Sequence, residues 1–480
     1  MLPRPPRSLI GSASKTCTLL SFAVLAAAAP LLVATPVGPG VLRVHPENPR
    51  WVTNDTGRAI FLTGSHTWAT VQERQLPETP NFNFDEWLDF TTGHGHNFLR
   101  VWVWEHASWM QFTERMVRYS PTIYERTGPG NALDGEPKFD LTRFNDAYFS
   151  RLRERVLRAN KRGLYVAVMF FQGFSLDKTG GKPGLQKAYN GHPYHRANNI
   201  NGIDGDPNGS GTGLQVHTLD NPAVLKVQEA YVRKMIDTLN DIDGLVWEIG
   251  NELHENAVDF QYYWIDFIKA YERTKPKQHL VGLTGAHVTN EKLFASNADW
   301  IAPEKQDGYH HDIPDAAGRK VIIIDTDHIE WLKSREDPTL PWRALMRGTS
   351  FIYMDTYKDA RFGSPPEPNA EEAEIRRQMG FAARFSRQID LARCIPHREL
   401  TSSEHCLAHP GHEYAAFVRA GEKLQLDLSA AVGAKFRVTW FDGQTGESHP
   451  AENVTARADL ILENPFPSHA AVHLQRIEKR

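Results

Sequence analysis

A carboxylate and an amide follow one apolar run near the middle of the chain. Residues 244–252 read Gly-Leu-Val-Trp-Glu-Ile-Gly-Asn-Glu, and a helical pattern follows over 257–275. A strand that ends in Asn251 and Glu252 would present a proton donor beside a hydrogen-bonding amide. That pairing suits general acid/base catalysis at an ether-like bond. The alternative is an acidic residue that only stabilises the start of the next helix.

Cleavage of a glycosidic bond requires two carboxyl groups, about 5–5.5 Å apart when configuration is retained. A second apolar run, 320–324, leads into Asp325-Thr326-Asp327-His328. Because side chains alternate along a strand, Ile323, Asp325 and Asp327 would share one face if the strand continued that far. We therefore predict Glu252 with Asp325 or Asp327 as the catalytic acids. Asp325 is the first choice because it lies nearest the strand, and at least one of the two aspartates is expected only to order loops or His328.

Other polar side chains lie at the ends of predicted strands. Arg100 lies within the strand predicted at 97–104, where a buried cation needs an anionic partner such as a carboxylate at 325 or 327. Trp104 lies near the rim and could stack on a sugar ring. Asn251 could hydrogen-bond a hydroxyl beside the scissile bond. The remaining candidates for hydroxyl binding, two or three of them expected to be only structural, are His66, Gln172, Tyr309, His310, His328 and Tyr357.

The elements that must position these residues alternate between strands and helices. Apolar runs predict strands at 59–65, 97–104, 164–171, 244–250, 279–284, 299–303, 320–324 and 350–354. Helical periodicity predicts helices at 84–92, 141–162, 222–240, 257–275 and 370–392. Near-continuous apolar strands are typical of parallel sheets that are buried on both faces. The pattern predicts an α/β fold, a (β/α)8 TIM barrel over 42–393, in which the C-terminal strand ends share one rim.

The pattern changes after residue 396. Short alternating runs at 414–419, 423–428, 436–441 and 460–463, with a turn cluster at 442–446, predict strands joined by tight turns. We expect a small C-terminal antiparallel β-sandwich over 396–480.

Composition excludes some classes of function. The chain has 480 residues, 41% of them hydrophobic and 23% charged, with a net charge of −4. These values fit a globular protein and argue against nucleic acid as a partner, since nucleic-acid binding usually requires a basic face. We expect a carbohydrate partner, either an oligosaccharide or a polysaccharide.

The N-terminus has the features of a secretory signal. Arg4, Arg7 and Lys15 precede an uncharged stretch, 16–34, with Ala27-Ala28-Ala29 as a small-residue cleavage site. We expect a signal peptide at 1–34, a secreted or periplasmic mature protein and no stable membrane contact after cleavage. An uncleaved N-terminal anchor is the alternative. Cys394 and Cys406 would then face an oxidising compartment and could pair.

The order of these residues resembles glycoside hydrolase clan A, a group of retaining (β/α)8 enzymes. The matching features are Arg100 in the second strand, Asn251-Glu252 after the fourth, a Tyr-His pair after the sixth and an acid after the seventh. The resemblance implies that Glu252 is the acid/base, that Asn251 binds substrate and that Asp325 is the nucleophile. The segments 198–203, 324–329 and 438–446 further resemble a bacterial group of barrels with a C-terminal domain labelled collagen-binding.

One departure from the clan concerns the nucleophile. The clan usually has Glu after the seventh strand, where this chain has Asp, and Glu304 or Glu330 could substitute for it. A wider gap between the carboxyl groups would favour inversion. The expected function is therefore a secreted glycoside hydrolase with a two-carboxylate mechanism and no cofactor. A non-catalytic carbohydrate-binding barrel is one alternative.

A metal-dependent hydrolase is the other alternative, because histidines are numerous. His94-Gly95-His96 has ligand-like spacing but precedes the second strand, which places it on the rim away from the chemistry. The Asp- and Asn-rich stretch 204–209 begins like a calcium loop but lacks its final Glu, so we interpret it as a turn. We therefore predict no metal ligands.

Overall fold

The computed structural model describes residues 40–75, 81–110, 115–176, 187–329, 335–358 and 367–478. The chain divides into a unit of Met1–Val37 and a unit of Gly38–Arg480, and the described residues belong to the second. The signal peptide expected at 1–34 and the alternative acid Glu330 lie outside the described residues. Within the described ranges, no helix is long and apolar enough to cross a membrane.

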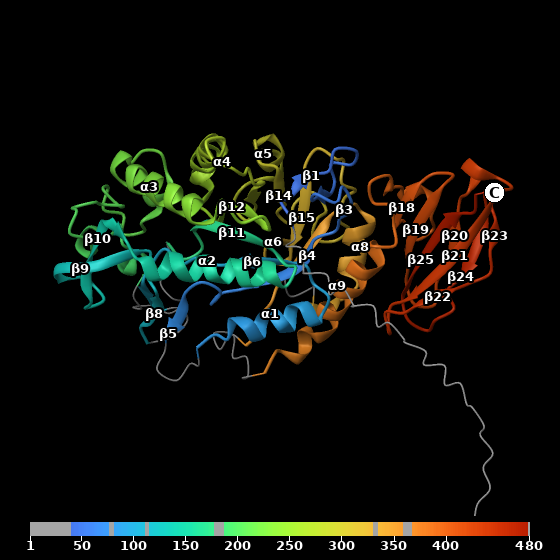
Figure 1. Ribbon diagram of the computed structural model, residues 1–480, viewed down its shortest axis with the longest axis horizontal. Coiled ribbons are helices and arrows are strands. Elements are labelled where there is room, and N and C mark those ends of the chain that lie inside the picture. The colour runs from blue at the N-terminus through green and yellow to red at the C-terminus, as the bar shows by residue number, and fades with distance from the viewer. Residues whose placement is uncertain are drawn as a thin grey trace, which may run out of the picture. The chain divides into compact units, whose positions relative to one another are not determined.

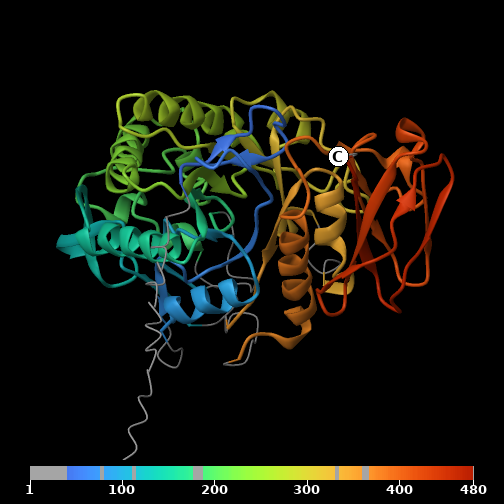
Figure 2. The same ribbon diagram turned by 45° about the vertical axis from the view of Figure 1, so that its right-hand side comes forward.

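Eight parallel strands close into a barrel, as the sequence predicts (Figures 1 and 2). Their spatial order is β11-β12-β13-β14-β15-β16-β4-β6, so chain neighbours are also neighbours in the barrel. Every residue of these strands is buried, which explains their continuous apolar runs. The strands are β4 (Thr63–Thr67), β6 (Phe98–Val101), β11 (Tyr165–Gln172), β12 (Leu245–Asn251), β13 (Val281–Thr284), β14 (Trp300–Ala302), β15 (Val321–Asp325) and β16 (Ser350–Met354).

Helices cover the outside of the barrel, and asparagines cap three of them (Figure 1). The side chains of Asn83, Asn145 and Asn221 accept backbone N–H groups in the first turns of α1, α2 and α3. The α-helices are α1 (Phe84–Gly93), α2 (Asp146–Lys161), α3 (Pro222–Leu239), α4 (Val258–Glu272), α5 (Asn290–Ala295), α6 (Thr326–Ile329), α8 (Leu340–Met346) and α9 (Ala373–Ser386). The 3₁₀ helices span Ala188–Gly191, Arg196–Asn198, Leu214–His217, Glu255–Ala257, Ala370–Glu372, Arg398–Leu400 and Ser429–Ala431.

The helix predicted at 141–162 is too long at its start. Residues up to Phe144 form β10 (Pro137–Phe144), which pairs with β9 (Tyr124–Asn131), and the helix begins at Asp146. Phe139 and Leu141 alternate with less buried residues, which is a strand pattern, and Asn145 then caps the helix. A second insertion also precedes the helix, a sheet of β5 (Glu73–Gln75), β8 (Val117–Ser120) and β7 (Ser108–Trp109).

A short N-terminal sheet closes the bottom of the barrel. It contains β1 (Arg43–Val44), β2 (Val52–Thr53) and β3 (Ala59–Ile60). Leu42 and Val52 belong to the same buried cluster as interior barrel residues such as Val246 and Ile323. The lower end of the barrel is therefore filled with apolar side chains, and the polar strand ends lie at the other rim.

The C-terminal segment forms two antiparallel layers, as predicted. A seven-stranded sheet has the order β17-β18-β19-β25-β21-β22, with β23 also paired to β21, and β20 pairs with β24 in a separate ribbon. Leu424 and Leu462 of the ribbon pack with Tyr414 and Val438 of the sheet. The strands are β17 (Ile395–Pro396), β18 (Cys406–His409), β19 (Glu413–Val418), β20 (Lys423–Leu426), β21 (Lys435–Asp442), β22 (Ser448–Pro450), β23 (Val454–Thr455), β24 (Leu460–Glu463) and β25 (Ala470–Arg476).

The other face of the seven-stranded sheet packs against the barrel. Phe417 and Phe441 belong to the main hydrophobic cluster together with Trp342 of α8 and Phe385 of α9. In both views the C-terminal strands lie beside these two helices (Figures 1 and 2). The sheet is therefore covered on both faces.

Cys394 and Cys406 are free and buried. Ile395 pairs with Ala408, which offsets the two cysteines by three positions on neighbouring strands. At ~3.4 Å per residue the offset is roughly 10 Å, and a disulfide needs a Cα separation of about 4.4–6.8 Å. The strand register therefore explains why they do not pair.

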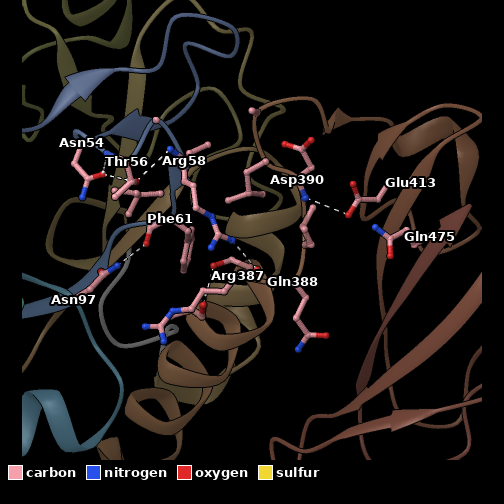
Figure 3. Close-up of a pocket in the computed structure, with 18 residues that line it drawn as sticks. Asn54, Thr56, Arg58, Phe61, Asn97, Arg387, Gln388, Asp390, Glu413 and Gln475 are labelled. Atoms are coloured by element: carbon pink, nitrogen blue, oxygen red, sulfur yellow. Dashed lines mark hydrogen bonds between the residues drawn. The ribbon is translucent and has the colours of Figure 1, made fainter. Parts of the chain in front are cut away.

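A cavity of about 540 Å³ lies at the N-terminal ends of the barrel strands (Figure 3). It is lined by Phe61 and Asn97, which precede β4 and β6, by residues after α9 such as Arg387, and by Glu413 and Gln475 of the C-terminal sheet. This cavity opens at the opposite end of the barrel from Glu252. It is therefore separate from the rim on which a barrel normally carries its chemistry.

Candidate active site

Glu252 follows directly after β12 and has a strained backbone. Its φ is +48°, a left-handed conformation that is unusual for a residue with a long side chain. Such strain costs on the order of 1–3 kcal/mol and persists only where the surroundings enforce it. The backbone of Gly173 lies so close that an added Cβ would be 2.4 Å from the carbonyl oxygen of Glu252. The neighbouring strand end therefore helps to fix the position of Glu252.

Asp327 is positioned by a helical turn. The strand β15 ends at Asp325, and α6 begins at Thr326. The alternation predicted for Ile323, Asp325 and Asp327 therefore stops at Asp325. The Asp325 carboxylate accepts the backbone N–H of Asp327 at 3.0 Å, which anchors the turn.

Glu252 and Asp327 face each other across the rim. One carboxylate oxygen of each, together with a ring nitrogen of His328, lies within 4.8 Å of the other two atoms. Glu252 and Asp327 are partly exposed, whereas His328 is buried. Burial raises the pKa of Asp327, and the nearby negative charge of Glu252 raises it further. The two acids thus form an electrostatically coupled pair that is accessible from outside.

Asp325 lies behind this pair and is completely buried. It accepts hydrogen bonds from His66 Nε2 and Arg100 Nη1, both at 3.3 Å. Burial alone would raise the pKa of Asp325, but His66, His328 and Arg100 outweigh it and hold that pKa well below its usual range. Asp325 is therefore an ionised anchor, and the first choice made from the sequence is not the acid that faces Glu252.

Glu248 is the principal partner of Arg100 and was missed by the sequence reasoning. Its carboxylate binds the guanidinium in a bidentate manner, with Arg100 Nε at 2.7 Å and Nη2 at 2.5 Å. All atoms of this pair are buried. The sequence did contain a signal for this pair, because Glu248 is a carboxylate inside the apolar run 244–250. A buried anion needs a buried cation, and Arg100 lies within another predicted strand.

Asn251 connects Arg100 to His328. Its Oδ1 accepts a hydrogen bond from Arg100 Nη2 at 2.8 Å and lies 3.1 Å from Nε2 of His328. Because that oxygen already accepts from Arg100, the His328 contact requires a proton on Nε2. The Asn251 Nδ2 is buried with no hydrogen-bond partner among the described residues. This buried amide therefore has an unused N–H donor.

Two of the predicted binding residues support the site without facing it. The ring of His66 is fully buried and stacks on Trp102, with centroids 5.7 Å apart. Trp104 does not expose a face for a sugar, because it lies in an aromatic cluster with Trp102 and Tyr119. Its indole N–H donates to the Trp68 carbonyl. The prediction that Trp104 stacks on substrate is corrected accordingly.

Gln172 belongs to a second buried polar network. Its backbone N–H donates to Glu105 Oε2 at 2.8 Å, and its side chain hydrogen-bonds Ser175 Oγ at 2.8 Å. Glu105 also contacts His217 Nε2 at 2.9 Å and lies 3.8 Å from His192 Nε2. Burial would raise the pKa of Glu105, but the two histidines lower it to about 2. Gln172 is therefore held inside the rim.

The structure does not bring Tyr309, His310 or Tyr357 to the acid pair through any contact between described residues. Tyr309 is part of the main hydrophobic cluster, and burial raises its pKa to about 12. His310 Nδ1 bonds the Lys305 carbonyl, and its ring lies against His311. Tyr357 packs on Phe82 and Phe90. These three residues form other parts of the rim loops.

The metal candidates weighed from the sequence have structural partners. Asp206 accepts hydrogen bonds from Ser210 Oγ and Gly211 N, which is turn stabilisation. His96 Nε2 bonds the Arg376 carbonyl on the lower rim. Burial raises the pKa of Glu304, but none of its contacts reaches the acid pair within the described segments.

The chain was compared with known proteins. The family described as Domain of unknown function (DUF6298) matches residues 49–299, more than half of the 480 residues. The chain belongs to this family. No curated protein matches it.

Solved structures of the same architecture are glycoside hydrolases. One, described as a glycoside hydrolase family 5 protein from Bacteroides vulgatus, has a TM-score of 0.60 and 14% identity, over 91% of this chain and 93% of that chain. Another, described as a glycoside hydrolase, has a TM-score of 0.56 and 12% identity, over 91% of this chain and 97% of that chain. At such identities the similarity establishes the fold, a TIM-like barrel with C-terminal antiparallel sheets, which this family member shares.

Proposed function

We propose that this protein is a retaining glycoside hydrolase. The observation that carries the proposal is the approach of Glu252 and Asp327, because one carboxylate oxygen of each lies within 4.8 Å of the other at the C-terminal rim of the barrel. Retaining glycosidases have carboxyl groups about 5–5.5 Å apart, whereas inverting enzymes need about 6.5–9.5 Å to admit a water molecule. Nearest oxygens within 4.8 Å agree with the retaining arrangement, and the stereochemistry of the product decides between the two.

The reaction would proceed in two displacements. In the first, with the proton of the coupled pair on Glu252, the Asp327 carboxylate attacks the anomeric carbon while Glu252 donates that proton to the departing glycosidic oxygen. In the second, Glu252 takes a proton from water, the water oxygen bonds to the anomeric carbon, and the bond to Asp327 breaks. Glu252 thus returns to its protonated form, and no cofactor takes part.

Asp327 is the better candidate for the nucleophile than Asp325. Asp325 is fully buried, and both its oxygens are engaged by Arg100, His66 and the backbone N–H of Asp327. Asp327 is partly exposed and next to Glu252. In clan A the strand-seven acid is the nucleophile, and here the role would pass to the acid two residues later because the strand ends in a helical turn.

Asn251 and His328 are the best supported substrate contacts. The buried Nδ2 of Asn251 has no hydrogen-bond partner among the described residues, and a sugar hydroxyl oxygen that reached it would complete its hydrogen bonding. His328 lies beside Asp327 and holds the Asn251 amide in place. The loops around the rim would recognise the rest of the oligosaccharide or polysaccharide. Water is the second substrate of the hydrolysis.

The test is hydrolysis of a panel of aryl glycosides and polysaccharides, with product stereochemistry followed by NMR. We expect retained configuration and loss of activity in Glu252→Gln. A 2-deoxy-2-fluoro glycoside should leave a covalent sugar on the peptide that contains Asp327, located by mass spectrometry. Sugar attached to Asp325, or activity unchanged in Glu252→Gln, would contradict the assignment.

A metal-dependent hydrolase is the second candidate, because Glu252, Asp327 and His328 are also of the type and spacing that bind Zn²⁺. If the metal carries the reaction, a chelator abolishes activity and Zn²⁺ restores it. A two-carboxylate glycosidase keeps its activity in the chelator. A non-catalytic carbohydrate-binding barrel would bind sugars but show no turnover with any member of the panel.

We also propose that the protein is exported. The basic residues before the uncharged stretch 16–34 support a leader that is removed during secretion. N-terminal sequencing of the exported protein tests this: a start close to residue 35 agrees with the proposal, and an intact Met1 in a membrane fraction supports the anchored alternative.

A further inference from the structure

Glu105 is buried at the junction of three segments near the acid pair. It lies four residues beyond the end of β6 and accepts the backbone N–H of Gln172, the last residue of β11, at 2.8 Å. His217 Nε2 lies 2.9 Å from the same carboxylate, and His192 Nε2 lies 3.8 Å from it. Glu105 thus connects the segment 187–217, which contains both histidines, to the end of the third barrel strand.

The end of that strand is in direct contact with the backbone of Glu252. Gln172 is paired in register with Asn251, and the next N–H, that of Gly173, donates to the Asn251 carbonyl at 2.8 Å. A Cβ on Gly173 would lie 2.4 Å from Glu252 O and 2.6 Å from Leu253 Cα. Gln172 and Gly173 therefore form a tight strap along Asn251 and Glu252.

The strap adjoins a residue that needs external support. Glu252 has φ +48°, which its own side chain does not favour, so neighbouring contacts must maintain it. Glu105 holds one side of the strap by a charge-assisted hydrogen bond, which is stronger than a bond between neutral groups. Removing the charge from Glu105 would loosen Gln172 and Gly173, and with them the backbone at residue 252.

We propose that Glu105 is a positioning residue, which through the Gln172–Gly173 strap holds the backbone of Glu252 in its left-handed conformation. The histidines of the 187–217 segment hold Glu105 in turn, so that segment and the acid/base are mechanically connected. The kinetic consequence rests on the proposed function, since it assumes that Glu252 is the proton donor. The structural consequence does not.

The first experiment is hydrogen exchange on the full chain with Glu105→Gln. We expect faster exchange in peptides that contain Gly173 and Leu253 than in the unmodified protein. Glu272→Gln is the matched control, because Glu272 is also buried and is also held by a histidine. The backbone N–H and the ring Nδ1 of His279 each lie 2.8 Å from its carboxylate. Glu272 lies at the other end of the barrel. Unchanged exchange at Gly173 and Leu253 in Glu105→Gln would overturn the proposal, whether or not the protein hydrolyses glycosides.

The second experiment measures hydrolysis of aryl glycosides with poor and good leaving groups. A misplaced proton donor slows the departure of a poor leaving group, whereas dinitrophenolate needs no protonation. Because kcat/KM reports the first displacement, we expect kcat/KM of Glu105→Gln to fall by roughly 100-fold for the poor leaving group, with a much smaller loss of kcat/KM for the dinitrophenyl glycoside. Equal losses for both substrates would mean a general structural role and would contradict the proposal.

Gly173→Ala provides a second variant if Glu105→Gln does not fold. It acts on the strap directly and leaves the Glu105 network intact, and it should give the same dependence on the leaving group. Failure of the unmodified protein to hydrolyse any substrate would refute the proposed function, while the exchange measurement would still decide the role of Glu105.

Discussion

Asp325 accepts the backbone N–H of Asp327 at 3.0 Å, although only Asp327 faces Glu252. The two aspartates therefore have different roles at neighbouring positions. One is a buried anchor that is ionised by Arg100 and His66, and the other is the accessible acid.

Asparagine substitutions should separate these roles. Asp327→Asn should lower kcat by more than about 10³-fold, since loss of a nucleophile is among the largest single losses in an enzyme, with little change in stability. Asp325→Asn should lower the free energy of unfolding by about 3–5 kcal/mol. The substitution removes one of the two buried carboxylates that balance the charge of Arg100. Steady-state kinetics and urea unfolding measure the two effects. Equal stability losses in both variants would contradict the division of roles.

Stability should fall between acid and neutral pH because of Glu372. Burial and the charge of Asp355 raise the pKa of Glu372 to about 7, above its ordinary value of 4.5. A carboxyl with a raised folded-state pKa binds more protons in the folded than in the unfolded chain, so stability declines as pH rises from about 4.5 to about 7. The unmodified protein should therefore lose stability between pH 5 and pH 8. In Glu372→Gln this loss in the free energy of unfolding should be smaller. Urea unfolding at both pH values measures this, with Glu374→Gln in the first turn of α9 as the control. An equally reduced loss in the control would contradict the assignment to Glu372.

The C-terminal sheet should unfold together with the barrel. Phe441 is buried against Trp342 and Phe385, so Phe441→Ala should cost about 3–5 kcal/mol. Denaturant unfolding followed by tryptophan fluorescence and by circular dichroism should give coincident single transitions. Ile461→Ala is the control, because Ile461 is 55% exposed and should change stability little. Two separated transitions in the unmodified protein would mean that this interface is weak.

Cys394 and Cys406 should remain thiols. A maleimide should label them only after unfolding, because both are buried and burial raises the pKa of each thiol. A reducing agent should leave the melting temperature unchanged. A lower melting temperature after reduction would indicate a bond that the strand register does not allow.

The barrel was predictable from the sequence because its strands are buried on both faces and appear as continuous apolar runs. The strand at 350–354 was predicted with its exact bounds, Ser350–Met354. Glu252 was predictable for the same reason, since it directly follows such a run. The predicted fold is confirmed, whereas the roles of the site residues stay predictions.

Other features depend on contacts that periodicity does not encode. The position of Asp327 depends on where β15 ends. At that end the backbone N–H of Asp327 donates to the Asp325 carboxylate. The strand predicted at 97–104 ends at Val101, so Trp104 lies beyond it, and the cluster that encloses Trp104 comes from Trp68 and Tyr119. The partner of Arg100 is distant in sequence, and only the closed barrel brings Glu248 to it.

The covered sheet has a consequence for adhesion. On the seven-stranded sheet, β20 and β24 occupy one side while α8 and α9 occupy the other, so neither face of that sheet is open to a fibrous ligand. Among the described residues, the open surfaces of this segment are the outer face of the β20–β24 ribbon, the strand edges and the turns. The tail is better viewed as a buttress for the last helices than as a portable module, so grafting it onto another enzyme should not transfer a binding specificity.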